Sequence, residues 1–140
     1  MTSHRYLTAV FCDDIRREEG NKLSLMGIYN GILQVPQFPV TVPKFSVLMS
    51  LYCSGPAPPP QSLQFTLFMD DLQLGQVQAD MSANSSDIPE DKRIIVSGVI
   101  QLFPLQFVSP CLLKARALCD GEELKGGTLS VELVAVPTAP

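Results

Sequence analysis

The chain has 140 residues, which suits one domain with its own core and leaves little room for two. Hydrophobic residues make up 46% of it and charged residues 17%, a composition that excludes a disordered chain. The formal net charge is -4, and the Lys and Arg residues are scattered. Nucleic acids and anionic membranes are therefore disfavoured as partners, because both are bound through basic patches.

The N-terminal residues 1–6 contain no apolar run, so we expect no signal peptide. No stretch of about 18 apolar residues is present, so we expect no membrane span. Both features predict a cytoplasmic protein. In such a compartment the cysteines should be buried free thiols, with a disulfide between strands as the alternative. The cysteines are Cys12, Cys53, Cys111 and Cys119.

An alternation of apolar and polar residues predicts β-strands along most of the chain. Breaker residues divide it into strands near residues 5–12, 22–29, 32–36, 44–53, 62–69, 73–80, 92–103, 110–119 and 128–136. Such strands bury one face and expose the other to solvent, which is typical of antiparallel sheets. We therefore predict an all-β fold with a single domain over residues 1–140. Its architecture should be a two-layer antiparallel β-sandwich (Ig-like, C2-like or jelly-roll-like) of about eight or nine strands.

Turn residues predict how these strands are connected. Asn30-Gly31 favours a type I′ hairpin, and Asp70-Asp71 favours a second hairpin. A third hairpin should open at Asp120-Gly121 and close at Gly126-Gly127. Prolines between residues 36 and 43 indicate a crossover between the sheets, with a phenylalanine available to plug the end of the sandwich.

Two glycines, Gly27 and Gly98, fall inside predicted strands. Strand glycines mark bulges or close backbone approaches, so we expect tight packing there, with ligand access as the lesser alternative.

The most distinctive surface segment is the charged stretch between residues 13 and 22, which we predict to be a loop or a single helical turn. Dense mixed charge suits electrostatic steering toward a protein partner. The candidate binding residues are Asp13, Asp14, Arg16, Arg17, Glu18, Glu19 and Asn21.

Residues 20–29, with the sequence GNKLSLMGIY, are followed by an F-P-x-x-x-P crossover at residues 38–43 and by a D-G-E-E-L hairpin at residues 120–124. With these motifs the chain resembles a family of small uncharacterised bacterial and prophage proteins, classed as a domain of unknown function. The resemblance implies a β-sandwich of bacterial or phage origin. It implies no reaction, cofactor or catalytic residue.

If every strand except the short 32–36 segment alternates in direction, eleven of the acidic residues share one end of the sandwich. Oxygen-rich loops of this kind can hold a hard cation, but basic residues lie in the same loops and the spacing matches no EF-hand. The acidic residues are Asp13, Asp14, Glu18, Glu19, Asp80, Asp87, Glu90, Asp91, Asp120, Glu122 and Glu123. If Asn30-Gly31 reverses the chain, this cluster splits between the two ends.

Nucleophile elbows, phosphate-binding loops and zinc motifs are missing, and the only histidine is His4. We therefore predict a non-enzymatic interaction module without cofactor or metal, phage-associated, that contacts a protein partner or a second copy of itself. It would be a virion component or an inhibitor of a host protein. Two alternatives stay open, a small-molecule or metal-sequestering protein and a carboxylate-based hydrolase.

Overall fold

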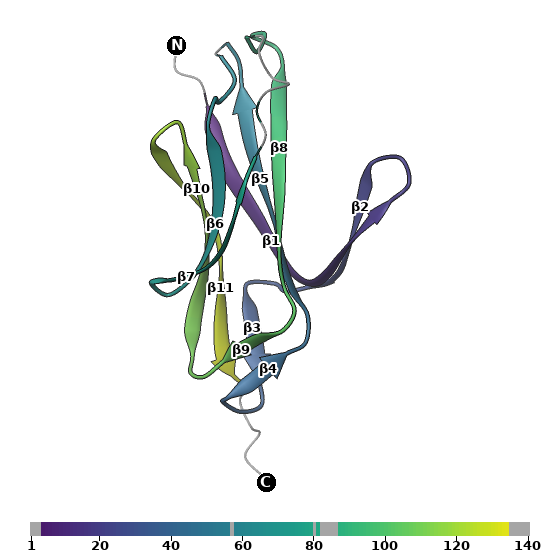
Figure 1. Cartoon of the computed structure of the whole chain (residues 1–140), viewed down its shortest axis with the longest axis vertical. Helices are drawn as coiled ribbons and strands as arrows, with labels where there is room; N and C mark the ends of the chain where they lie inside the picture. Colours follow the sequence, from purple (N-terminus) through teal and green to yellow (C-terminus); the bar gives the residue numbers. More distant parts are fainter. Residues whose placement is uncertain (1–3, 57, 80, 82–86, 135–140) are drawn as a thin grey trace.

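The computed structural model describes residues 4–56, 58–79, 81 and 87–134. Over these residues the chain is all-β, as predicted, with no helix (Figure 1). It has eleven strands, more than the eight or nine predicted, because the short strands β4 and β9 were not foreseen. A four-stranded sheet has the order β2-β1-β5-β8, a five-stranded sheet the order β3-β11-β10-β6-β7, and β4 and β9 form a short ribbon. Two sheets facing each other give the sandwich that the alternating pattern predicts.

The strands have the following bounds. The four-stranded sheet contains β1 (Arg5–Glu18), β2 (Lys22–Ile28), β5 (Phe45–Ser54) and β8 (Arg93–Leu102). The five-stranded sheet contains β3 (Ile32–Val35), β6 (Leu63–Met69), β7 (Leu72–Gln78), β10 (Cys111–Cys119) and β11 (Glu122–Leu133). The ribbon contains β4 (Val40–Val42) and β9 (Leu105–Phe107).

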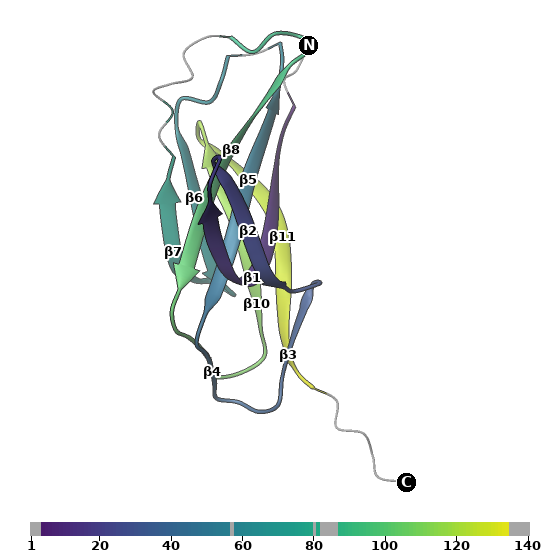
Figure 2. The ribbon, with the colours of Figure 1, turned by 90° about the vertical axis from the view of Figure 1, so that its right-hand side faces the viewer.

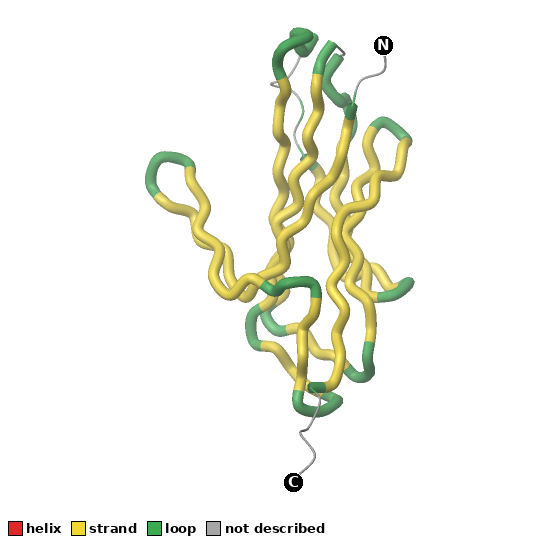
Figure 3. Tube along the Cα trace, turned by 180° about the vertical axis from the view of Figure 1, so that it is seen from behind, coloured by secondary structure: helices red, strands yellow, loops and turns green. Residues whose placement is uncertain are grey.

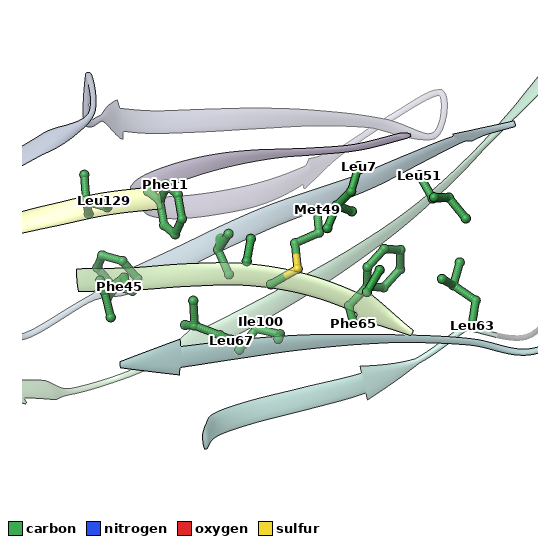
Figure 4. Packing of buried hydrophobic residues seen from close by; sticks show 14 of the residues in the cluster. Leu7, Phe11, Phe45, Met49, Leu51, Leu63, Phe65, Leu67, Ile100 and Leu129 are labelled. Carbon is green, nitrogen blue, oxygen red and sulfur yellow. The ribbon is translucent and has the colours of Figure 1, made fainter. Parts of the chain in front are cut away.

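The core lies between the two sheets and is built from alternate residues of each strand (Figure 4). On β5 the inward residues Val47, Met49 and Leu51 are completely buried. Phe65 and Leu67 of β6 face them and are also completely buried. Each such side chain contributes about 1.5–3 kcal/mol of transfer free energy. The period of two therefore determines which face of each strand points inward.

Two predicted connections are confirmed. β6 and β7 form a hairpin around Asp70-Asp71, in which Met69 is paired with Leu72. The proline-rich segment after β3 carries the chain from the five-stranded to the four-stranded sheet, and its half-buried Phe38 packs against the core.

The direction of one strand differs from the antiparallel arrangement predicted for all of them. β3 runs parallel to β11, whereas every other strand pair among the described residues is antiparallel.

One predicted hairpin does not form, and another forms as predicted but closes earlier. Asn30-Gly31 makes no hairpin, because β2 and β3 belong to different sheets and only Gly31 of the pair has a positive φ. At the third hairpin, the turn closes at once after Asp120-Gly121. β11 then begins at Glu122 and runs through Gly126-Gly127, because that strand pairs with β10 along its whole length apart from one bulge.

The predicted loop over the charged stretch is also wrong, because β1 continues as a strand to Glu18. Residues 14–18 pair with residues 22–26 of β2, and the turn between them contains Gly20 and Asn21, both at positive φ. A two-stranded ribbon with water around it needs no apolar alternation, which is why the sequence pattern did not reveal it. We call residues 13–28 the arm.

The predicted acidic end does not form as one surface. Asp13 and Asp14 lie where the arm begins, whereas Asp120 lies at the other end of β1, where it forms an ion pair with Arg5 at 3.2 Å. β1 runs antiparallel to β5 from Arg5, so the eight residues of this pairing separate the two groups. Asp80 lies outside the described residues.

Gly98 confirms the expected close approach. Its position faces inward, where an added Cβ would lie 2.5 Å from Cδ2 of the buried Phe65 and 3.0 Å from Cγ1 of Val77. Gly127 lies in a strand of the opposite sheet, where an added Cβ would meet nothing closer than 3.7 Å.

The matched substitutions Gly98→Ala and Gly127→Ala test this packing. We expect Gly98→Ala to lower the free energy of unfolding by about 1–3 kcal/mol, because the Phe65 ring cannot move without disturbing the core. Gly127→Ala should change it by less than about 0.5 kcal/mol. Urea unfolding of both variants measures the difference, and equal stability of the two would contradict the packing described.

Candidate functional site

The arm exists because β1 is longer than the strand beside it. β1 has 14 residues and β5 has 10, and the shared register ends at Cys12, which pairs with Ser46 of β5 and also with Ile28 of β2. Beyond Cys12, β1 has only β2 as a partner, so the two strands leave the sheet together. Figures 1 and 3 show the arm standing away from the sandwich.

Asp13 holds the base of the arm. The Tyr29 hydroxyl donates a hydrogen bond to its carboxylate, and the Ser46 hydroxyl donates one to its backbone carbonyl at 3.3 Å. Gly27 lies opposite with φ of 71°, and an added Cβ there would overlap the Asp13 carboxylate. Glycine at this position therefore permits both the bend of the backbone and the approach of the carboxylate.

Asp14 makes a second set of contacts at the base. Its carboxylate accepts a hydrogen bond from the Ile15 amide at 2.9 Å and lies 3.7 Å from Arg16 and 3.6 Å from Lys44. The side-chain amide of Gln101, on β8, donates to the Ile15 carbonyl at 3.4 Å. The arm is thus tied to β8 as well as to β5.

The outer face of the four-stranded sheet lies behind the arm in the view of Figure 2. The register aligns its outward side chains in three rows across β1, β5 and β8. The rows are Tyr6–Tyr52–Ile95, Thr8–Ser50–Ser97 and Val10–Leu48–Val99.

Two of these rows are apolar and the row between them carries hydroxyls. Tyr6 and Tyr52 stack with ring centroids 4.8 Å apart, and Ser50 and Ser97 are hydrogen-bonded at 2.9 Å. Tyr6 is 48% exposed and Ile95 is 53% exposed. The face is therefore ordered by side-chain contacts and still presents apolar surface to solvent.

A groove of about 690 Å³ separates the arm from this sheet. Arg17 and Leu23 line it from the arm, and Ile95, Ser97 and Val99 line it from β8. A smaller hollow of about 220 Å³ at the arm base shares Arg17, Leu23 and Val99 with it, so the two adjoin. Val77 of β7 also lines the groove, which therefore reaches round the free edge of β8.

The structure distributes the seven predicted binding residues over three places. Arg17, Glu18 and Asn21 line the groove, together with Lys22. Asp13 and Asp14 hold the base, whereas Arg16 and Glu19 are exposed on the arm outside the groove lining. The prediction missed the β8 residues, although their alternation of outward and inward side chains was visible in the sequence.

The thiols and carboxylates show no reactive arrangement in the part of the chain that the structure describes. All four cysteines are free there, and burial raises the pKa of Cys53 and Cys111 to about 11, so both stay protonated at neutral pH. Burial also raises the pKa of Cys12 and Cys119. Among the described residues, no group of three potential ligands could hold a metal ion, and no helix could cross a membrane.

A family model for a family of unknown function, DUF6941, matches residues 7–132, from the first sheet strand through the last. The chain belongs to this family. The match includes the arm and β8, so both walls of the groove lie within the family domain. No curated protein and no solved structure matches the chain.

Tyr29→Phe tests the anchor of the arm. Loss of a hydrogen bond to a carboxylate should lower the free energy of unfolding by about 1.5–3 kcal/mol and speed amide exchange in the arm. Tyr52→Phe is the matched control, since no hydrogen bond of the Tyr52 hydroxyl occurs among the described residues. An equal effect of both substitutions on unfolding would contradict the anchoring role of Tyr29.

The same pair of variants has a predicted pH dependence. Burial, and then the hydrogen bond to Asp13, raise the pKa of Tyr29 above its usual value. A raised pKa on folding means that the hydroxyl contributes stability below the unfolded pKa of about 10 and loses it as the pH rises further. The stability advantage of the wild type over Tyr29→Phe should therefore be constant up to about pH 9 and decrease above pH 10.

Proposed function

We propose that this protein is a non-enzymatic interaction module that binds another protein through the outer face of the four-stranded sheet and the arm. The observation that carries the proposal is the groove between them. Its floor is formed by Ile95, Ser97 and Val99 of β8, and its wall is a charged hairpin. Partially apolar surfaces bordered by polar residues are typical of protein interaction sites.

The composition of the arm supports the same function. Arg17 and Lys22 face the groove and form no ion pair within the described residues, whereas Asp14 at the base is neutralised by Arg16 and Lys44. Charges left unpaired at the rim of an apolar surface favour steering and specificity more than affinity. The arm therefore fits a role in selecting a partner.

A small-molecule binder is the second candidate, because the groove volume lies within the range of about 300–1,000 Å³ that is usual for ligand sites. Thermal-shift screening against nucleotides and metal ions separates the two. A ligand at 100 times its Kd should add about 2.7 kcal/mol to the stability. No observation favours the carboxylate-based hydrolase, since Asp13 and Asp14 are engaged in holding the arm.

The remaining predictions concern the origin, the location and the biological role of the protein. A phage or prophage origin, a place in the virion or in the host cytoplasm, and a role as virion component or as inhibitor of a host protein remain predictions. The neighbouring genes test them, because tail genes and small early genes indicate different roles.

Site-specific photo-crosslinking in the organism that encodes the chain tests the interaction surface. A photoreactive residue at Tyr6 or Ile95, on the outer face, should give a discrete crosslinked protein. The control position is Leu118 of β10, which has a similar exposure (48%) on the other sheet. Crosslinks only from Leu118, or none from Tyr6 and Ile95, would contradict the proposed surface.

A further inference from the structure

β8 is a long edge strand with one open side. It lies at the end of its sheet and pairs with β5 over ten residues without a register shift. Its backbone groups on the other side pair with no strand of the described chain. Edges of this kind are templates for the addition of another strand.

The hydrogen bonds between neighbouring strands show which β8 residues direct their backbone groups toward the open edge. The Gly55 amide donates to the Lys92 carbonyl, so Lys92 and the even-numbered residues after it direct their backbone groups toward β5. The Ser54 amide donates to the His4 carbonyl, which gives β5 the same alternation. The amides and carbonyls of Ile95, Ser97 and Val99 therefore point to the open edge, where they meet no hydrogen-bond partner among the described residues.

The edge also lacks the features with which proteins usually block strand addition. Between Ile94 and Leu102 there is no charged residue and no proline. The other edges of the sheets differ. β2 has seven residues, with a lysine at its start and Gly27 at a positive φ near its end. β3 has four residues, and β7 is interrupted by a register shift against β6. β8 is therefore the edge most open to pairing, and it is the edge that the groove reaches.

From these observations we infer that β8 binds an extended peptide segment of a partner protein by strand addition, beside the arm. The segment would pair with the backbone of Ile95, Ser97 and Val99 and place apolar side chains toward the groove. A carboxylate of the segment would meet Arg17, since the groove lining has two cations, Arg17 and Lys22, against the single carboxylate of Glu18. This inference rests on the proposed function, because it names how the same surface recognises its partner.

The test begins with a display library of random linear peptides selected on the full chain. Enriched peptides should lack proline, alternate apolar residues with others and carry Asp or Glu. A synthetic peptide of the enriched sequence is then the probe for binding and for amide exchange. Absence of any enriched peptide would overturn the inference.

Amide exchange on the wild type gives the direct signature. On binding the peptide, the amides of Ile95, Ser97 and Val99 should exchange at least about tenfold more slowly, because they gain partners. The amides of Ile94 and Val96 point toward β5 and should change little. Protection of both sets alike, or of neither, would overturn strand addition.

Two pairs of variants separate backbone pairing from charge. Ser97→Pro removes an outward amide and should weaken peptide binding at least about tenfold, since proline is tolerated where an edge amide faces solvent but cannot pair there. Ser97→Ala loses the same hydroxyl, which is hydrogen-bonded to Ser50, but keeps the amide and should bind within about twofold of the wild type. Wild-type affinity in Ser97→Pro would overturn the inference.

Arg17→Glu should weaken binding about fivefold, whereas Lys125→Glu, which makes the same charge change on the exposed side of the five-stranded sheet, should stay within about twofold. Equal effects of the two substitutions would contradict the proposed contact between Arg17 and a carboxylate of the peptide.

A second copy of the chain is the competing occupant. Protection of the same amides in the free protein, together with a concentration-dependent dimer, would show self-pairing and overturn the peptide inference. The outcomes remain separate from those for the proposed function. If crosslinks from Tyr6 or Ile95 persist in the Ser97→Pro variant, they support the proposed interaction surface and contradict strand addition at β8.

Discussion

The change of partner along β1 at Cys12 is the constraint on which the rest of the structure depends. Before this residue the strand belongs to the sandwich, and after it the strand has only β2 beside it, because β5 begins at Phe45. A two-stranded ribbon is marginally stable alone. It needs the contacts at its base. The Tyr29 hydroxyl donates to the Asp13 carboxylate, the Ser46 hydroxyl of β5 donates to the Asp13 carbonyl, and the Gln101 side chain of β8 donates to the Ile15 carbonyl.

The outer faces of the two sheets differ in character. The five-stranded sheet carries Lys114 and Lys125 around a small charged hollow of about 250 Å³. The four-stranded sheet instead presents two apolar rows and a free edge, both beside the arm. Tyr6 and Ile95, which are about half exposed, belong to the surface through which we propose that a partner binds.

Much of the fold follows from the sequence because burial on one face imposes a period of two. This rule identified the inward residues of β5 and β6 and the strand containing Gly98. It failed for the arm, where only Ile15 is buried and charged residues can form a strand without apolar alternation. It also failed at Asn30-Gly31, because the local preference for a hairpin gave way to the pairing of β3 with β11. Of the site, the sequence indicated the charged arm but not the facing strand, since a sheet edge is a property of strand order.

The central claim is that residues 13–28 form a strand pair anchored at its base and held off the outer face. Through-space NMR contacts in the full chain test it most directly. The account predicts backbone contacts between Arg17 and Leu23, which are paired across the arm, and contacts between the Gln101 side chain and Ile15 at the base. Helical or random-coil chemical shifts over residues 13–19, with neither set of contacts, would contradict it.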